Sequence, residues 1–536
     1  MTSGTVTRDR TAAGAGRDGF ARVLRAEWTK FRTVRGWAVG TLVAVAAIVG
    51  LGLLPGLQGS CGKQGPASTC TLPVGPGGQE VSDSFFFVHQ PLAGDGSITV
   101  RMTSLTGLLP AGSAGPRGPA GSPGPAGPAG PGTGEEMRAG LAPWTKAGLI
   151  VKASTQLGSA YAAVMVTGSH GVRMQDDYVH DTAGPPGTVT PAAPRWLRLT
   201  RAGDTLTGAA SADGTHWTTI GSAHLAGLPS TVQAGLFTAS PQYVEAIGAA
   251  GASTGPSQAT AAFDHLDRQG TWPANAWTGE KIGGADNAGP LERGGFDQSG
   301  GGFTVTGSGD IAPAVSGAAG LGTTITQTLA GTFAGLLLVV VVATMFITAE
   351  YRRGLIRTTL AASPRRGRVL AAKALVLGAV TALAGLAAAA VVVTFGQRIL
   401  RGNGVYVHPA TALTEVRLIA GTAALLAVAA VLALAIGAAL RRSTVAVTAV
   451  IVVIVLPYLL SISVLPAGAA RWLLRITPAA GFAVQQSAAS YPQVSNLYTP
   501  ADGYFPLAPW TGFAVLCAWT ALALAVAAFL LRRRDA

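Results

Sequence analysis

Six long apolar runs constrain the fold of this 536-residue chain more than any other feature of it. A helix needs about 20 apolar residues to cross the hydrocarbon core of a bilayer. Runs of this kind are Trp37–Leu54, Leu329–Ala349, Val369–Phe395, Leu418–Leu440, Thr444–Leu465 and Trp510–Leu531. Only 12% of the residues are charged, against roughly 25% in ordinary soluble domains. We therefore predict a polytopic α-helical membrane protein with six transmembrane helices.

The first of these runs has an alternative interpretation as a cleaved signal peptide, because it is short and lies near the N-terminus. We favour an uncleaved span. The basic lead of 36 residues is long for a signal peptide, and no Ala-x-Ala cleavage site follows the run. In addition, the stretch Gln58–Cys61 lacks the Leu expected at a lipoprotein cleavage site.

Basic side chains are concentrated in a few short segments between the apolar runs. Residues 1–36, 350–373, 441–442 and 532–535 together hold 20 Lys and Arg against 5 Asp and Glu. The long segment 56–321 holds 13 basic and 18 acidic residues. Cytoplasmic loops of membrane proteins carry the excess of Lys and Arg, so we predict that both termini are cytoplasmic. The formal net charge of +13 then reflects topology, and no nucleic-acid partner is expected.

We expect the protein to lie in the cell membrane. The predicted topology divides its chain into four regions. A cytoplasmic lead occupies residues 1–36, and the first span occupies 37–55. An extracellular domain follows over 56–321. The other five spans lie within 322–536 and are interrupted by a cytoplasmic loop at 350–370. The lipid bilayer is therefore the first partner that the sequence implies.

The extracellular segment has the pattern of an all-β domain. Short alternating runs bounded by turn residues predict strands at Ile98–Met102, Ala147–Val151, Tyr161–Val166, Trp196–Arg201, Thr205–Ser211, Trp217–Ser222 and Val232–Thr238. Between two of these runs, Ala212-Asp213-Gly214-Thr215 predicts a hairpin, because Gly accepts the positive φ that the turn requires. Arg201–Asp204 predicts a second turn. Many short strands at close spacing favour an antiparallel sandwich.

Three stretches of this segment, Gly96–Arg101, Trp144–Ile150 and Pro194–Arg201, resemble bacterial concanavalin/laminin-G-like jelly-roll domains. The resemblance covers about 170 residues. It implies a β sandwich whose ligand is a glycan, but it assigns no binding residue in this chain.

Two local features lie within the same segment. Gly recurs at every third position from Gly115 to Gly130, with Pro between, which makes residues 115–132 a collagen-like loop. A tract this short on one chain favours a polyproline-type surface loop over a triple helix. Cys61 and Cys70 lie on the side where oxidation is permitted, so we predict a local disulfide between them. Two free thiols are the alternative.

Motifs for catalysis, metal binding and cofactor binding are missing from the sequence. No His-Glu-x-x-His occurs, and the seven histidines show no ligand spacing. Gly251–Gly255 matches a nucleophile-elbow pattern but lacks the strand-to-helix context. Gly62-Lys63 does not belong to a phosphate loop. We therefore expect no enzyme activity and no cofactor, and because the spans are nearly free of ionisable groups, any transport must draw its energy from a second protein.

The basic lead contains an amphipathic helix. Its apolar arc at 100° per residue consists of Phe20, Val23, Leu24, Trp28, Phe31 and Val34. Such a helix lies in the headgroup plane before a span, although a plain positive anchor is the alternative.

Glu27 falls inside the apolar arc, where a carboxylate is costly unless it is paired. We predict a cytoplasmic pairing site of Glu27, Glu350 and Arg353, in which Glu27 pairs with a cation of the loop after the second span. The alternative is that Glu27 reaches the interface alone. Lys373 is interpreted as a span-end residue that reaches the interface.

The loop from Glu350 to Lys373 combines basic residues with a short apolar helix face. Leu355, Ile356, Thr359 and Leu360 form that face, and Pro364 ends it. Positive flanks of a span do not require an apolar face, so the loop has a second role.

The lead around Glu27-Trp28-Thr29-Lys30, the six spans and the loop Glu350-Tyr-Arg-Arg-Gly through Lys373 resemble ABC-2 type permease subunits of high-GC bacteria. In that family the loop after the second span contains a coupling helix that docks on a separate ATPase subunit. The resemblance places this role on Leu355–Ser363, with the coupling residues Leu355, Ile356, Arg357, Leu360 and Ser363. It also predicts short outer-leaflet helices over Ala469–Gln486. The chain departs from the family by its insert of about 265 residues.

Two functions of different classes compete at this point. The first is the permease subunit of an ATP-driven exporter, which pairs with a second permease as a homodimer or heterodimer and with two ATPase subunits. The second is a glycan-binding membrane-anchored sensor on the same six-helix frame. A membrane enzyme ranks third because its motifs are missing.

Overall fold

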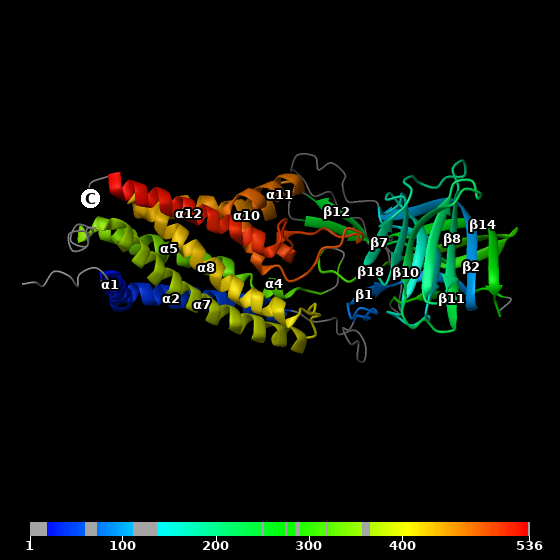
Figure 1. Ribbon diagram of the computed structural model, residues 1–536, viewed down its shortest axis with the longest axis horizontal. Coiled ribbons are helices and arrows are strands. Elements are labelled where there is room, and N and C mark those ends of the chain that lie inside the picture. The colour runs from blue at the N-terminus through cyan, green and yellow to red at the C-terminus, as the bar shows by residue number, and fades with distance from the viewer. Residues whose placement is uncertain are drawn as a thin grey trace, which may run out of the picture.

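The computed structural model describes residues 19–58, 72–110, 137–247, 251–273, 276–284, 290–317, 320, 322–355 and 365–533. The molecule is elongated, with a helical bundle at one end and a β domain, residues 72–317, at the other (Figure 1). The end of the bundle farthest from the β domain is called the distal end below. The first helix and the C-terminal end of the chain both lie there (Figure 1).

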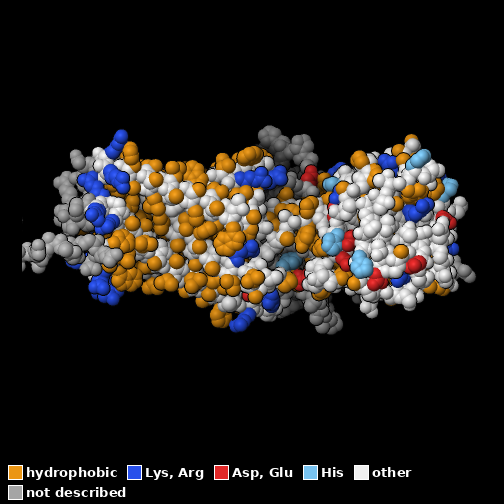
Figure 2. Space-filling view, viewed as in Figure 1, with side chains coloured by type: hydrophobic (Ala, Val, Ile, Leu, Met, Phe, Trp, Pro, Cys, Tyr) orange, Lys and Arg blue, Asp and Glu red, His pale blue; other side chains and the backbone are white. Residues whose placement is uncertain are grey.

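Six helices of the described residues are long and apolar enough to cross a membrane, which confirms the six predicted runs. They are α2 (Arg35–Gln58), α5 (Gly331–Arg352), α7 (Arg366–Gly402), α8 (Ala412–Leu440), the fifth formed by α9 (Ser443–Val450), a π-helical turn (Ile451–Val455) and α10 (Leu456–Ser463), and α12 (Pro509–Arg533). Figure 2 shows apolar side chains along the flank of the bundle and Lys and Arg at its distal end. A flank of this composition suits contact with lipid.

Shorter helices flank the spans. They are α1 (Gly19–Thr33), α3 (Pro290–Arg293), α4 (Ile325–Thr328), α11 (Ala467–Ile476) and two 3₁₀ helices at Pro478–Gln485 and Pro500–Asp502. The helix α11 and the first 3₁₀ helix cover the stretch in which short helices are predicted.

Glycines bring the first two spans together. A Cβ on Gly335 or Gly331 of α5 would collide with Ile48 of α2. Small residues at such contacts allow close van der Waals packing, which holds membrane helices together where the hydrophobic effect cannot.

The β domain contains the strands β1 (Val81–Asp83), β2 (Phe85–Pro110), β3 (Met137–Ala139), β4 (Lys146–Lys152), β5 (Tyr161–Thr167), β6 (Val172–Asp176), β7 (His180–Ala183), β8 (Arg195–Ala202), β9 (Thr205–Ser211), β10 (Thr218–His224), β11 (Thr231–Ala239), β12 (Tyr243–Ile247), β13 (Gly251–Gly255), β14 (Gln258–Thr271), β15 (Thr278–Ile282), β16 (Gly295–Ser299), β17 (Gly302–Gly307) and β18 (Ile311–Pro313). All pairings between these strands are antiparallel.

Two layers share the long strand β2. One layer has the order β7-β6-β5-β4-β11-β2-β15, and the other has the order β10-β9-β8-β2-β14-β17-β16. The first part of β2 pairs with β11 and β15, and its later part pairs with β8 and β14. Between the layers lies an apolar core that includes Leu149, Val164, Leu197 and Val305. The prediction of an all-β domain inserted into a helical membrane protein is therefore confirmed.

The predicted hairpin lies between β9 and β10. Gly214 has a φ of +79°, and the Asp213 carboxylate accepts hydrogen bonds from the backbone N–H groups of Thr215 and His216, both at 2.8 Å. The second predicted turn also holds a Gly with positive φ, Gly203 at +61°. The hydrogen bonds of Asp213 and the freedom of Gly to adopt this conformation explain why the short motif was informative.

Strands β1 and β18 form a two-stranded stem where the chain enters and leaves the β domain, with Val81 opposite Pro313. The stem is fixed to the sandwich by buried ion pairs: Lys152 Nζ lies 2.7 Å from Asp83 Oδ2, and Lys146 Nζ lies 2.6 Å from Asp310 Oδ1. Both lysines are fully buried, and every residue of β4 is buried, so this strand is covered on both faces. The predicted disulfide Cys61–Cys70 and the collagen-like loop lie outside the described residues.

Candidate functional site: an ion cluster beside the coupling loop

The amphipathic helix α1 lies at the distal end and turns only part of the predicted arc inward, because Trp28 and Val34 of that arc are exposed. Phe31 is 5% exposed and Glu27 only 1% exposed, whereas Trp28 is 46% exposed. Arg22 and Arg25 on the opposite side are exposed. A buried carboxylate on the apolar face needs a cation, because an unpaired buried charge is expensive.

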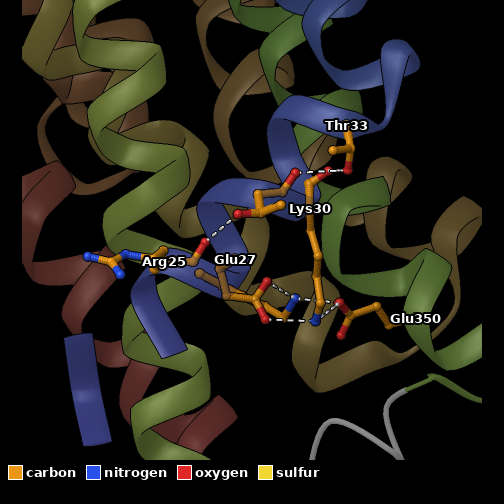
Figure 3. Close-up of polar contacts among 7 residues, drawn as sticks. Arg25, Glu27, Lys30, Thr33 and Glu350 are labelled. Carbon is orange, nitrogen blue, oxygen red and sulfur yellow. Dashed lines mark hydrogen bonds and ion pairs between the residues drawn. The ribbon is translucent and has the colours of Figure 1, made fainter. Parts of the chain in front are cut away.

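Four side chains from three helices meet at this point and are called the distal ion cluster below. Lys373 Nζ of α7 lies 2.7 Å from Glu27 Oε2 of α1 and 2.7 Å from Glu350 Oε1 of α5. Lys30 Nζ lies 2.9 Å from Glu27 Oε1 and 3.1 Å from Glu350 Oε1. Figure 3 shows Glu27 and Lys30 extending from α1 toward Glu350. The two lysines and two glutamates balance in charge.

Aromatic rings enclose the buried part of the cluster. Lys373 Nζ lies 4.8 Å from the centroid of the Phe346 ring. The same ring meets Phe31 edge-on at 5.8 Å and Trp37 edge-on at 5.9 Å. A cation on an aromatic face gains further stabilisation when both are shielded from water. The cluster and these rings therefore join α1 and α2 to α5 and α7.

Exposure differs sharply within the cluster. The Lys373 side chain is fully buried, the Glu350 side chain is 10% exposed, and the Lys30 side chain is 40% exposed. Burial lowers the pKa of Lys30, but the hydrogen bond to Glu27 and the negative charges of Glu350 and Glu27 outweigh this effect, so its pKa is raised. Lys30 therefore keeps its charge at neutral pH and closes the cluster on the solvent side.

The cluster flanks the predicted coupling loop on both sides. Glu350 lies two residues before the end of α5, and Lys373 lies about two helical turns after the start of α7. Leu355, which follows α5, is 49% exposed. The other coupling residues, Ile356, Arg357, Leu360 and Ser363, lie outside the described residues, and their role stays a prediction.

The sequence identified the need for a partner of Glu27 but not the partner itself. Arg353 is exposed just after α5, and Glu27 pairs instead with Lys373 and Lys30. The interpretation of Lys373 as a residue that reaches the membrane interface is wrong, because it points into the cluster and is fully buried. The signal that could have identified Lys373 as buried and paired is its position about two turns inside an apolar helix.

At its other end, the bundle contacts the β domain through hydrogen bonds from the loop before α12. Gln493 Nε2 donates to Val179 O at 3.0 Å, and Asn496 Nδ2 donates to Ser316 O at 2.8 Å. A second contact joins the two parts where His408 Nδ1 lies 3.6 Å from Glu80 Oε2. We call these contacts the junction.

The junction is expected to weaken as the pH rises through neutrality. Burial raises the pKa of Glu80 to about 7, and the positive charge of Arg401 opposes this only in part. Because this pKa lies above the ordinary value, the stabilisation is complete below about pH 4.5 and is lost as the pH rises through 7. Thermal unfolding at pH 6 and pH 8 measures the effect, with Glu80→Gln as the variant that removes it. Equal pH dependence in both proteins would contradict the assignment.

These features define a class of protein, a polytopic membrane protein whose helical bundle carries an inserted β sandwich. The chain belongs to the ABC-2 family of transporters: the family described as "ABC-2 family transporter protein" matches residues 195–536, more than half of the chain. The match begins at β8 and includes five of the six apolar helices of the described residues. This chain is therefore a membrane-spanning permease component of an ABC transporter.

Comparison with curated protein sequences gives no match. Among solved structures, a functionally unknown protein from Saccharomyces cerevisiae is 12% identical, with 39% of this chain and 85% of that chain covered at a TM-score of 0.21. Scytalido-glutamic peptidase with a transition state analog inhibitor is 9% identical, with 42% and 98% covered at a TM-score of 0.23. Similarity at this level defines no shared function.

Proposed function

We propose that this chain is the permease subunit of an ATP-driven exporter that is energised by separate ATPase subunits. The observation that supports this most directly is the distal ion cluster. It ties α1 to the two helices that flank the predicted coupling loop, through Lys373 and Glu350. Because both ends of the loop are held by the cluster, a displacement of the loop is transmitted to α5 and α7 together.

In this proposal two permeases, either two copies of this chain or this chain and a sister permease, enclose a path across the membrane. Closure of the two ATPases on ATP draws the coupling loops together, because ATP binds the closed state better. The cluster makes α1, α5 and α7 move as one body, so the change at the loops reaches the spans. The path then switches from inward-facing to outward-facing.

The experiment that tests this function uses the tagged full-length chain, co-expressed with a candidate ABC ATPase and purified in mild detergent. We expect the ATPase to co-purify and its hydrolysis rate to rise several-fold when the complex is placed in liposomes. An ATPase that neither co-purifies nor responds would overturn the proposal. The membrane-anchored sensor, whose β domain binds a glycan, would then take its place.

The proposed orientation places the distal end in the cytoplasm and the β domain outside. The gathering of Lys and Arg at the distal end supports it (Figure 2). Protease added to intact cells or spheroplasts is expected to cleave within the β domain and to spare Leu355 and the loop that follows it. Permeabilised cells serve as the control, in which both regions become accessible. Cleavage of the loop in sealed cells would reverse the proposed topology.

A further inference from the structure

A cavity of about 440 Å³ lies where the β domain, the stem and the bundle meet. Its wall includes Ser82 of the stem and Ser84 just after β1, Ser240, Ser257 and Lys281 of the sandwich, and Ser495 from the loop before α12. This volume falls within the range of about 300–1,000 Å³ that is typical of small-molecule sites. The cavity is not part of the distal ion cluster and lies at the opposite end of the bundle.

Lys281 provides the positive charge of this cavity. Its Nζ donates to Ser308 O at 2.6 Å and to Ser308 Oγ at 3.3 Å. Within the described ranges no carboxylate lies within 4.0 Å of Lys281 Nζ. Burial lowers the pKa of Lys281 to about 8, and the charge of Glu292 offsets only part of that effect. An ammonium group that has lost water and has no carboxylate in direct contact favours an anion.

Two carboxylates, those of Glu292 and Asp310, belong to the wall. Among the described residues neither forms an ion pair with Lys281 within 4.0 Å, and Glu292 acts on it only through its charge at longer range. Asp310 Oδ1 accepts a hydrogen bond from Lys146 Nζ at 2.6 Å and another from the Ile311 N–H at 2.8 Å. Asp310 is thus committed to the buried ion pair that fixes the stem. Lys281 is in direct contact with neither carboxylate, so its ammonium group is open to an occupant of the cavity.

Serine hydroxyls supply most of the remaining polar side chains of the wall, together with Gln242. A hydroxyl group both donates and accepts hydrogen bonds, so a wall of serines suits a ligand that carries hydroxyl groups of its own. Ser240 Oγ and Ser257 Oγ lie 2.6 Å apart, and Ser240 Oγ lies 3.1 Å from Thr145 Oγ1. This chain of hydroxyls anchors one wall of the cavity to β4, because Thr145 directly precedes that strand.

We propose that the cavity binds a small anionic, hydroxylated molecule of the size of a monosaccharide or disaccharide, with its anionic group at Lys281, and that the membrane helices sense its occupancy. The proposal that the membrane helices sense occupancy follows from the segments that line the cavity. Ala312–Val315 lead through the connecting residues toward α4, and Val494 and Ser495 belong to the loop that leads to α12. A ligand held between these segments fixes the outer ends of two spans relative to the sandwich. This role would make transport dependent on a ligand, which goes beyond the proposed function.

The test measures binding to the full-length protein in detergent by isothermal titration calorimetry. The probes are glucuronate, which carries a carboxylate, glucose 6-phosphate, which carries a phosphate, and glucose, which carries neither. We expect at least one anionic probe to bind at least tenfold more tightly than glucose, and the better of the two identifies the anionic group. Failure of both anions to bind, or equal binding of glucose, would overturn the proposal.

Two variants locate the site. Lys281→Gln removes the charge and is expected to weaken binding of the anionic probe at least tenfold, while Lys281→Arg retains most of it. Ala314→Phe fills the cavity, keeps Lys281 and is expected to abolish binding. Arg442→Gln makes the same charge change at an exposed position on the bundle and is expected to have no effect. If Lys281→Gln and Ala314→Phe both bind like the wild type, the cavity is not the site.

Sensing is tested separately by hydrogen exchange. Binding of the probe is expected to slow amide exchange in residues 490–508 and 312–328, and to leave the distal end unchanged. Binding without any change in those two segments would overturn the sensing part. These results do not depend on an ATPase, so failure of the proposed transport function is distinguishable from failure of this inference.

Discussion

Replacement of Lys373 by methionine is expected to destabilise the protein by about 3–5 kcal/mol, the usual cost of removing one partner from a buried ion pair. Lys373 is fully buried and contacts both Glu27 and Glu350 at 2.7 Å. Without it, two carboxylates face one another with Lys30 as their shared cation. Thermal unfolding of the purified protein in detergent measures the loss as a lower midpoint temperature. Stimulation of the ATPase is expected to fall as well, because α1 is no longer held against α7.

Two matched variants distinguish a buried charge from a lost contact. Lys30→Met makes the same chemical change at a side chain that is 40% exposed, so it is expected to cost about 1 kcal/mol or less. The triple variant Lys373→Met, Glu27→Gln and Glu350→Gln removes the unpaired charges and is expected to regain much of the stability, since apolar or neutral replacement of a whole buried ion cluster is often tolerated. Equal melting of Lys373→Met and Lys30→Met would show that the cluster does not hold the helices together.

The positions of the spans and of the sandwich were predictable because both depend on local pattern. A run of about 20 apolar residues has few alternatives to crossing a bilayer, and the Asp213-Gly214 turn contains its own hydrogen bonds. The strand Thr205–Ser211 was predicted with the bounds of β9 for the same reason. The alternation of apolar and polar residues in this strand and the turns at both of its ends are all local signals, because they lie within a few residues of each other.

The partner of Glu27 could not be predicted in this way. Glu27 and Lys373 are separated by 346 positions in the sequence, and their contact depends on the packing of α1 against α7. The hydropathy of a lysine is the same whether its side chain points toward lipid, solvent or another helix, so hydropathy could not show that Lys373 is buried and paired. The stem was missed for a similar reason, because β1 and β18 are three residues long and pair across the whole domain. Short strands of this kind carry too little alternation to be recognised.

The apolar face of the predicted coupling helix is expected to be essential for binding of the ATPase. Leu355→Asp combined with Leu360→Asp is expected to abolish co-purification of the ATPase and stimulation of its hydrolysis. A helix that seats in a groove depends on a few apolar anchors, and loss of one or two of them typically costs a few kcal/mol of binding. Leu355 is 49% exposed, so a charge there is expected to leave the fold intact, and an unchanged melting temperature would verify this. The measurement is one detergent pull-down combined with an ATPase assay.

Two controls separate coupling from general damage. Leu413→Asp places the same charge at the start of α8, where Leu413 is 83% exposed, and should leave ATPase binding unchanged. Deletion of residues 84–310 with a short flexible bridge removes the sandwich, and the pairing of Val81 with Pro313 brings the cut ends close together. That variant is also expected to bind the ATPase, because the sandwich lies at the other end of the molecule from the distal ion cluster. A double aspartate variant that still binds and stimulates the ATPase would show that coupling runs through another surface, and the exposed face of α1 would be the next segment to test.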